Sequence, residues 1–154
     1  MTHIEILNAL NGKLIVSCQD YTSVMVDAAI RGGASGLRIN SAGHVRQARK
    51  ATGVPIIGCN KMYMPNSPVY ITPTIRAAVV LIRAGADIVA FDCTRRKRSR
   101  HQPIDIIDAI HSEGALALAD LSCCAEVESA VSDGADILAT TLSPKLDWDF
   151  LRHC

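Results

Sequence analysis

Six short apolar runs along the chain each end in a polar side chain. The runs cover residues 13–19, 36–40, 54–61, 87–92, 116–120 and 136–141. Short apolar runs that alternate with helical stretches are typical of parallel strands buried on both faces. The carboxyl ends of parallel strands meet at one edge of a sheet, where α/β folds place their sites. The pattern therefore predicts a polar site at that edge, built from Gln19, Arg38, Lys61, Asp92, Asp120 and Thr140.

Helices are expected between these strands, at residues 24–31, 44–51, 73–83, 103–112 and 125–131. Five of the strands follow a glycine suited to ending the preceding helix in a left-handed conformation, namely Gly33, Gly53, Gly85, Gly114 and Gly134. The helix caps that the sequence suggests are Ser23 or Thr22, then Ser41, Thr72 and Ser122. Repetition of helix, glycine and strand indicates an α/β fold made of βα units.

The length limits how many units the chain can hold. A complete barrel of eight βα units usually needs roughly 200 residues or more, and this chain has 154. We therefore expect one domain, residues 1–154, that forms a TIM-barrel-type array of about six parallel strands without closing. Its first and last strands are either exposed edges or are covered by a partner chain, which favours a homo-oligomer.

Composition narrows the class of protein. Hydrophobic residues make up 49% of the chain and the net charge is +1, which fits one globular core without an acidic or basic bias. No long apolar stretch predicts a signal peptide or a membrane span, so we expect a cytoplasmic protein. Cys18, Cys59 and Cys93 fall in predicted buried strands, where packing is favoured over disulfide formation. The five histidines are scattered, and no metal site is predicted.

A basic stretch, residues 95–101, follows the fourth predicted strand. Nucleic-acid binding is disfavoured because no aromatic residues interleave with these charges and the rest of the chain is not basic. Two interpretations stay open: the guanidinium groups hold an anionic substrate, or the stretch is a solvated loop.

Lys61 stands at the end of an otherwise apolar strand. We expect its side chain to be partly desolvated and close to Arg38, and both influences favour the neutral amine that accepts a proton. An ion pair with Asp92 or Asp120 across the sheet end is the structural alternative.

The residues from Lys61 onward resemble a segment of the N-acetylmannosamine-6-phosphate 2-epimerases. Residues 61–74 read Lys-Met-Tyr-Met-Pro-Asn-Ser-Pro-Val-Tyr-Ile-Thr-Pro-Thr, and the Tyr-Ile-Thr-Pro-Thr block is specific to the family. Segments 12–19, 36–40, 54–58, 85–94 with Arg96 and Arg98, 119–122 and 140–143 are similar to family segments in the same order. The resemblance therefore extends over residues 12–143.

This resemblance implies a TIM-barrel fold and the interconversion of N-acetylmannosamine 6-phosphate and N-acetylglucosamine 6-phosphate, in sialic acid and amino sugar catabolism. It implies no cofactor. Lys61 would act as general acid/base, taking a proton from C2 before a proton returns on the opposite face. The substrate-binding residues that the resemblance implies are Gln19, Arg38, Asn40, Asp92, Thr94, Arg96, Asp120 and Thr140.

The chain also departs from the family pattern. We do not find the last two βα units, which bring a glutamate in an Ala-Glu-Gly-Arg strand and the backbone amides that hold the phosphate. Ser41 replaces a usual glycine, and Met62 and Met64 stand where a basic residue and a tyrosine are common. A catalytically silent partial barrel that binds a sugar phosphate or a partner subunit is therefore the alternative. A different phosphosugar enzyme is disfavoured by the block at residues 70–74.

Overall fold

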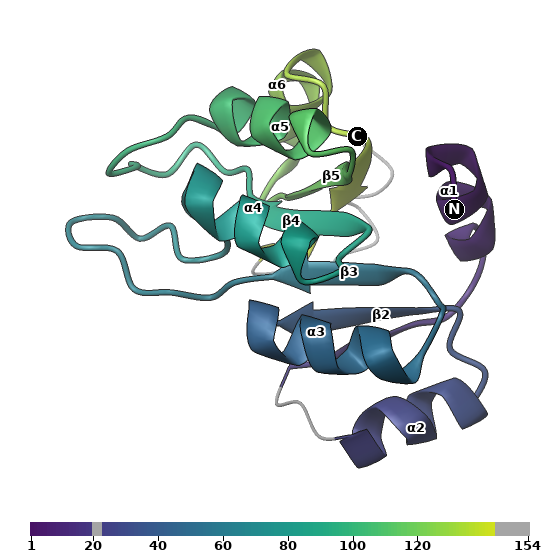
Figure 1. Cartoon of the computed structure of the whole chain (residues 1–154). Helices are drawn as coiled ribbons and strands as arrows, with labels where there is room; N and C mark the ends of the chain where they lie inside the picture. Colours follow the sequence, from purple (N-terminus) through teal and green to yellow (C-terminus); the bar gives the residue numbers. More distant parts are fainter. Residues whose placement is uncertain (20–22, 144–154) are drawn as a thin grey trace.

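The computed structural model describes residues 1–19 and 23–143 (Figure 1). Its sheet has six strands in sequence order, and every neighbouring pair is parallel. Within the described residues the first and last strands do not pair, so the array of βα units is open, as predicted. The strands are β1 (Ile15–Cys18), β2 (Gly36–Asn40), β3 (Ile56–Cys59), β4 (Ile88–Asp92), β5 (Leu116–Asp120) and β6 (Ile137–Ala139).

The helices alternate with the strands, as the sequence pattern predicts. They are α1 (His3–Leu10), α2 (Ser23–Arg31), α3 (Ala42–Ala51), α4 (Ile75–Arg83), α5 (Pro103–Ser112) and α6 (Val127–Ser132), with a 3₁₀ turn η1 (Cys124–Glu126) before α6. Four of the five glycines proposed to end helices have positive φ angles, and Gly53 is the exception.

Two of the expected helix caps are wrong. Helix α4 begins after Thr74, whose hydroxyl accepts a hydrogen bond from the Ala77 N–H at 3.1 Å, so Thr72 is not its cap. Ser122 instead donates its hydroxyl to the Glu126 carboxylate, and Cys123 is the residue that precedes η1. The expected cap of α3 is confirmed, because the Ser41 hydroxyl accepts a hydrogen bond from the His44 N–H at 3.4 Å. Thr22 lies outside the described residues.

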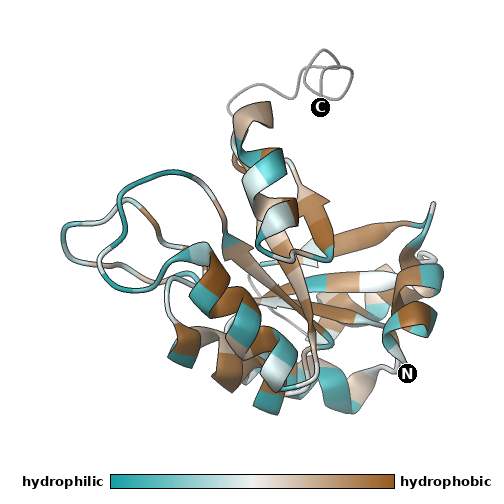
Figure 2. Cartoon of the chain, turned by 90° about the horizontal axis from the view of Figure 1, so that it is seen from above, coloured by the Kyte–Doolittle hydropathy of each residue, from teal (hydrophilic) through white to brown (hydrophobic). Residues whose placement is uncertain are grey.

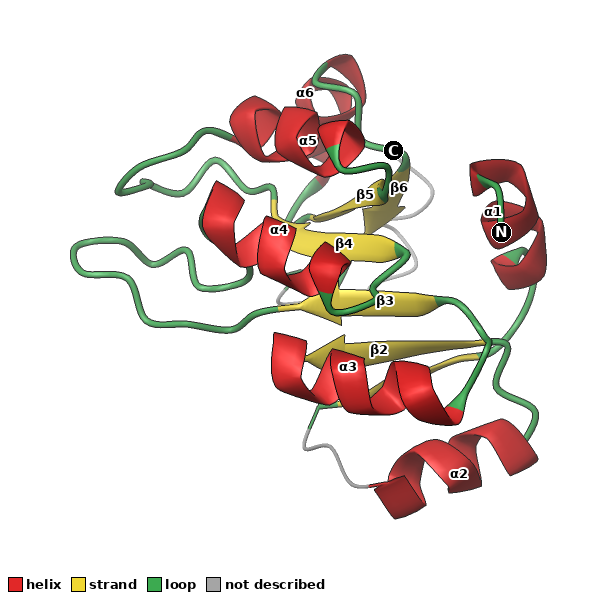
Figure 3. Cartoon of the chain, viewed as in Figure 1, coloured by secondary structure: helices red, strands yellow, loops and turns green. Residues whose placement is uncertain are grey.

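The two faces of the sheet bury different sets of side chains. Helices α2 to α6 lie on the outer face of the sheet (Figure 3). The buried cluster on this side contains Leu37, Val89 and Phe91 of the strands together with helix residues such as Ile106. The strands are mostly apolar, while the helices carry both apolar and polar positions (Figure 2). The expected burial of Cys18, Cys59 and Cys93 is confirmed, and all three thiols are free.

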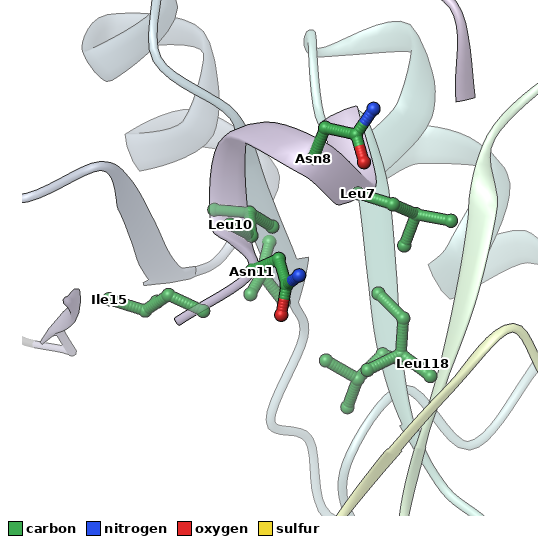
Figure 4. A pocket seen from close by; sticks show the side chains of 8 residues that line it. Leu7, Asn8, Leu10, Asn11, Ile15 and Leu118 are labelled. Carbon is green, nitrogen blue, oxygen red and sulfur yellow. The ribbon is translucent and has the colours of Figure 1, made fainter. Parts of the chain in front are cut away.

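Helix α1 covers the amino-terminal end of the inner face. Its Ile6 is buried against apolar strand residues, and the His3 Nε2 atom lies 3.0 Å from the Gly114 carbonyl oxygen, just before β5. Leu7 and Leu10 line a mainly apolar cavity of about 370 Å³ together with strand residues that include Leu118 (Figure 4). This cavity lies at the opposite end of the sheet from the carboxyl ends of the strands, so α1 serves packing rather than the candidate site.

The open sheet exposes apolar side chains along both edges, so we expect the chain to self-associate. Leu14, just before β1, is 57% exposed, and Leu138 on β6 is 39% exposed. Apolar edge strands favour pairing with a second copy. Leu14→Lys combined with Leu138→Lys should shift sedimentation velocity toward the monomer. Val24→Lys, at the exposed start of α2, is the control and should leave association unchanged. An equal effect of the control and of the leucine substitutions would contradict an edge interface.

Candidate functional site

The polar residues at the carboxyl ends of the strands lie on the inner face. Residues two apart on a strand share a face, and the inner face carries Ile57 and Cys59 of β3 and Leu116 and Leu118 of β5. Asp120 continues the second of these series. This alternation places polar side chains in the concave interior at the carboxyl ends of the strands. Toward the amino-terminal ends of the strands, the same face is apolar.

The strongest polar contact in this interior joins β2 to β5. Arg38 donates from Nη1 to Asp120 Oδ1 at 2.9 Å and from Nη2 to Asp120 Oδ2 at 2.5 Å, a bidentate pair. Strands β3 and β4 lie between these two strands, so the contact requires the sheet to be curved. The Asp120 side chain is fully buried and that of Arg38 is 12% exposed. Burial alone disfavours the charged guanidinium, but the hydrogen bonds and charge of Asp120 outweigh it and raise the pKa of Arg38.

Thr141 completes this pair. Its hydroxyl donates a hydrogen bond to Asp120 Oδ1. The sequence analysis proposed Thr140 for this region, but Thr140 is half-buried and its carbonyl oxygen accepts the Ser143 N–H at 3.0 Å. The structure therefore brings Thr141 rather than Thr140 to the Asp120 carboxylate.

Asp92 organises the loop that follows β4. Thr94 donates to Asp92 Oδ1 from its N–H at 3.0 Å and from its hydroxyl at 2.7 Å. Arg96 pairs with Asp92 Oδ2 and donates from Nε to the Thr94 hydroxyl at 2.9 Å. Arg98, whose side chain is 4% exposed, donates to the Asp92 carbonyl oxygen. Burial lowers the pKa of the Arg98 guanidinium, and the charge of Asp92 counteracts this.

These contacts resolve part of the question about the basic stretch. Arg96 and Arg98 fold the loop around Asp92, and Arg95 donates to the Ala125 carbonyl oxygen at 2.6 Å. Lys97 and Arg100 are exposed to solvent. Much of the stretch is therefore structural. These guanidinium groups bond to protein atoms, so their contacts do not support the prediction that they hold an anion.

Glu126 is a buried polar residue that the sequence analysis missed. Its carboxylate accepts hydrogen bonds from the Arg95 N–H at 3.0 Å and from the Ser122 N–H at 2.7 Å. Burial alone would raise the pKa of Glu126, but these hydrogen bonds outweigh it and lower the pKa. Glu126 thus ties the loop after β4 to the loop after β5. A carboxylate in a predicted helix gives no sign in the sequence that it will be buried.

Lys61 lies where the chain leaves β3 for a hairpin-like loop. Its N–H donates to Asn40 Oδ1 at 2.9 Å, and Lys61 forms an antiparallel bridge with Ile71. The residue is exposed, so the expected partial desolvation is wrong for this structure. The chain turns outward after Cys59 and carries Lys61 to the rim of the sheet. Among the described residues no ion pair involves Lys61, because the carboxylates of Asp92 and Asp120 are engaged by arginines.

Cys59 lies among three of the predicted site residues. Its thiol is fully buried and is 4.0 Å from Gln19 Oε1, while Gln19 Nε2 donates to the Ser17 hydroxyl at 2.8 Å. Burial raises the pKa of the Cys59 thiol, and the positive charges of Arg38 and Lys61 act against that rise. Gln19, Arg38 and Lys61 are therefore grouped around one buried thiol at the strand ends.

Over residues 1–19 and 23–143, no group of three or more histidine, cysteine or carboxylate side chains could hold a metal ion. None of the helices in these residues is long and apolar enough to cross a membrane.

The chain is similar to proteins of known family. The family model described as "Putative N-acetylmannosamine-6-phosphate epimerase" matches residues 22–147. The "Bifunctional enzyme NanE/NanK" of Brucella melitensis is 41% identical over an alignment of 172 positions, gaps included, that covers 97% of this chain and 32% of that protein. A Thermosynechococcus vestitus protein named "Putative N-acetylmannosamine-6-phosphate 2-epimerase" is 42% identical over an alignment of 145 positions, gaps included, that covers 86% of this chain.

The fold agrees with a solved structure. The N-acetylmannosamine-6-phosphate 2-epimerase from Clostridium perfringens superposes with a TM-score of 0.91 at 33% sequence identity, over 98% of this chain and 75% of that one. The present chain spans 32% of the length of the Brucella protein and 63% of the Thermosynechococcus protein. It belongs to the N-acetylmannosamine-6-phosphate epimerase family.

Proposed function

We propose that the chain is an isomerase that interconverts N-acetylmannosamine 6-phosphate and N-acetylglucosamine 6-phosphate in cytoplasmic amino sugar catabolism. One observation carries the proposal: Lys61 stands at the carboxyl edge of the sheet while both neighbouring carboxylates are bound to arginines. Without an ion pair among the described residues, the Lys61 side chain is not tied to another side chain and can reach a substrate bound at this edge. The similarity to the epimerases supports the choice of substrate.

The reaction inverts C2 of the sugar. In the open-chain form the C2–H bond lies next to the aldehyde, so its proton is acidic. Lys61 takes this proton as a neutral amine, the C–H electron pair forms a C1–C2 double bond, and the aldehyde oxygen becomes an oxyanion. A proton from solvent then adds to the opposite face of C2 and restores the aldehyde with inverted configuration, and the Lys61 ammonium releases its proton to solvent. No electrons are lost or gained, so the proposal includes no redox cofactor.

Arg38 is suited to stabilise the oxyanion. The bidentate contact with Asp120 fixes the plane of the guanidinium, and only two of its N–H groups are used in that contact. Donors held in place before the reaction stabilise developing charge without reorganising. Gln19, beside Cys59, can donate or accept toward the sugar hydroxyls from the same edge. Asp92, Thr94 and Arg96 shape the neighbouring wall through their own network.

Turnover of the phosphorylated sugar tests this function. The chain is incubated with N-acetylmannosamine 6-phosphate, and proton NMR follows the appearance of N-acetylglucosamine 6-phosphate. We expect slow conversion of the phosphorylated sugar. Unphosphorylated N-acetylmannosamine is the control, and we expect no conversion of it. Saturable binding of the phosphorylated sugar without conversion would contradict the proposal and favour the silent sugar-phosphate binder.

A further inference from the structure

We propose that Asn40 and Thr72 are positioning residues that hold the backbone of Lys61 between β2 and β4. The catalytic importance of this placement rests on the proposed function of Lys61. The placement itself rests on hydrogen bonds within the described residues and can be tested separately.

Asn40 extends the sheet beyond its last backbone pair. The ladder between β2 and β3 ends where Asn40 pairs with Cys59, so a further backbone partner for Lys61 is missing on this side. The Asn40 side-chain oxygen takes that place and accepts the Lys61 N–H at 2.9 Å. The family resemblance implies that Asn40 binds the substrate, whereas in the structure its side-chain oxygen accepts the backbone N–H of Lys61. Asn40 therefore links Lys61 to the strand that carries Arg38.

Thr72 holds the preceding residue from the other side. Its hydroxyl accepts the Asn60 N–H at 3.0 Å and donates to the Ala90 carbonyl oxygen of β4 at 2.6 Å. Its own N–H donates to the Asn60 carbonyl oxygen at 2.9 Å. Thr72 is fully buried and has a φ of +45°, a conformation that is strained for a β-branched residue. Such strain persists only where surrounding contacts over-determine it, and it clusters at functional sites.

Together the two residues fix Lys61 relative to both neighbouring strands. Its own N–H is held from β2 through Asn40, and Asn60 is held to β4 through Thr72. Because Lys61 is exposed and has no ion pair among the described residues, its side chain gains little fixed direction from other charges. The hydrogen bonds of Asn40 and Thr72 therefore set the position of the Lys61 backbone from which the side chain extends. A displacement of about 1 Å at a reacting group can cost about 100-fold in rate.

The first test is amide hydrogen exchange of the ¹⁵N-labelled chain, which needs no turnover. Asn40→Leu removes the acceptor, whereas Asn40→Asp keeps an acceptor oxygen at the same position. We expect the Lys61 N–H to exchange about tenfold faster or more in Asn40→Leu and near the native rate in Asn40→Asp. Thr72→Val should accelerate exchange of the Asn60 N–H, and Thr72→Ser should not. Native protection of both amides in Asn40→Leu and Thr72→Val would overturn the proposal.

The second test separates positioning from substrate contact. Thr72→Val should lower kcat for epimerisation by about 10- to 100-fold with KM unchanged, and Thr72→Ser should restore it. A rise in KM at constant kcat would overturn the positioning role. If the native chain shows no turnover, the proposed function fails, while amide exchange still decides whether Asn40 and Thr72 hold Lys61.

Discussion

Asp120→Ala should lower the free energy of unfolding by about 3–5 kcal/mol, the usual cost of removing one partner of a buried ion pair. The carboxylate is fully buried and accepts both the Arg38 guanidinium and the Thr141 hydroxyl. Its removal leaves the Arg38 charge, itself only 12% exposed, without a counter-charge in the interior. Thr141 is exposed and can turn to water. Urea unfolding followed by circular dichroism measures the difference.

Two further variants identify the cause of this loss. Asp108→Ala, on the exposed side of α5, removes a carboxylate without a buried partner and should change stability by less than about 0.5 kcal/mol. Arg38→Met combined with Asp120→Leu removes both charges and should be less destabilising than Asp120→Ala alone. If Asp120→Ala costs no more than the Asp108→Ala control, the pair does not hold the curved sheet together.

The strands and their order could be predicted because buried parallel strands leave a plain sequence signal. Apolar runs such as residues 87–92 and 116–120 correspond to β4 and β5, since both faces of these strands are covered. The polar residue that ends each run predicts where the candidate site lies, because the carboxyl ends of parallel strands meet at one edge of the sheet. The helix at residues 103–112 was also located correctly, helped by Pro103 in its first turn.

What the sequence could not show depends on contacts between distant segments. The sequence suggests Thr72 as a helix cap, but its hydroxyl bonds to Asn60 and to Ala90 of β4, which lie beside it only in the folded chain. The exposure of Lys61 follows from the outward turn of that hairpin. The hydrogen bond from Thr141 to Asp120 likewise depends on where the fold places Asp120. The roles predicted for the substrate-binding residues stay predictions.

Lys61→Arg should reduce exchange of the C2 proton by at least about 100-fold, the lower bound of the usual contribution of a positioned acid/base. Arginine keeps the positive charge and the length of the side chain, but its guanidinium stays protonated and cannot accept the C2 proton. Because Lys61 is exposed and makes no ion pair among the described residues, the substitution should leave the free energy of unfolding nearly unchanged. Urea unfolding of the variant checks that the loss is chemical.

Lys50→Arg is the matched control for this substitution. Lys50 is an exposed residue in the last turn of α3, at the opposite end of the sheet from the carboxyl ends of the strands. The same change of side chain there should leave exchange at the native rate. An equal loss in both variants would mean that the substitution acts through general perturbation of the chain.

The most direct measurement is deuterium incorporation from D₂O into C2 of N-acetylmannosamine 6-phosphate, followed by proton NMR. It detects proton removal even when net epimerisation is slow. The account predicts incorporation by the native chain and by Lys50→Arg, and none above background by Lys61→Arg. Equal incorporation by the native chain and Lys61→Arg would exclude Lys61 as the base, and no incorporation by any of the three would contradict the proposed epimerase activity.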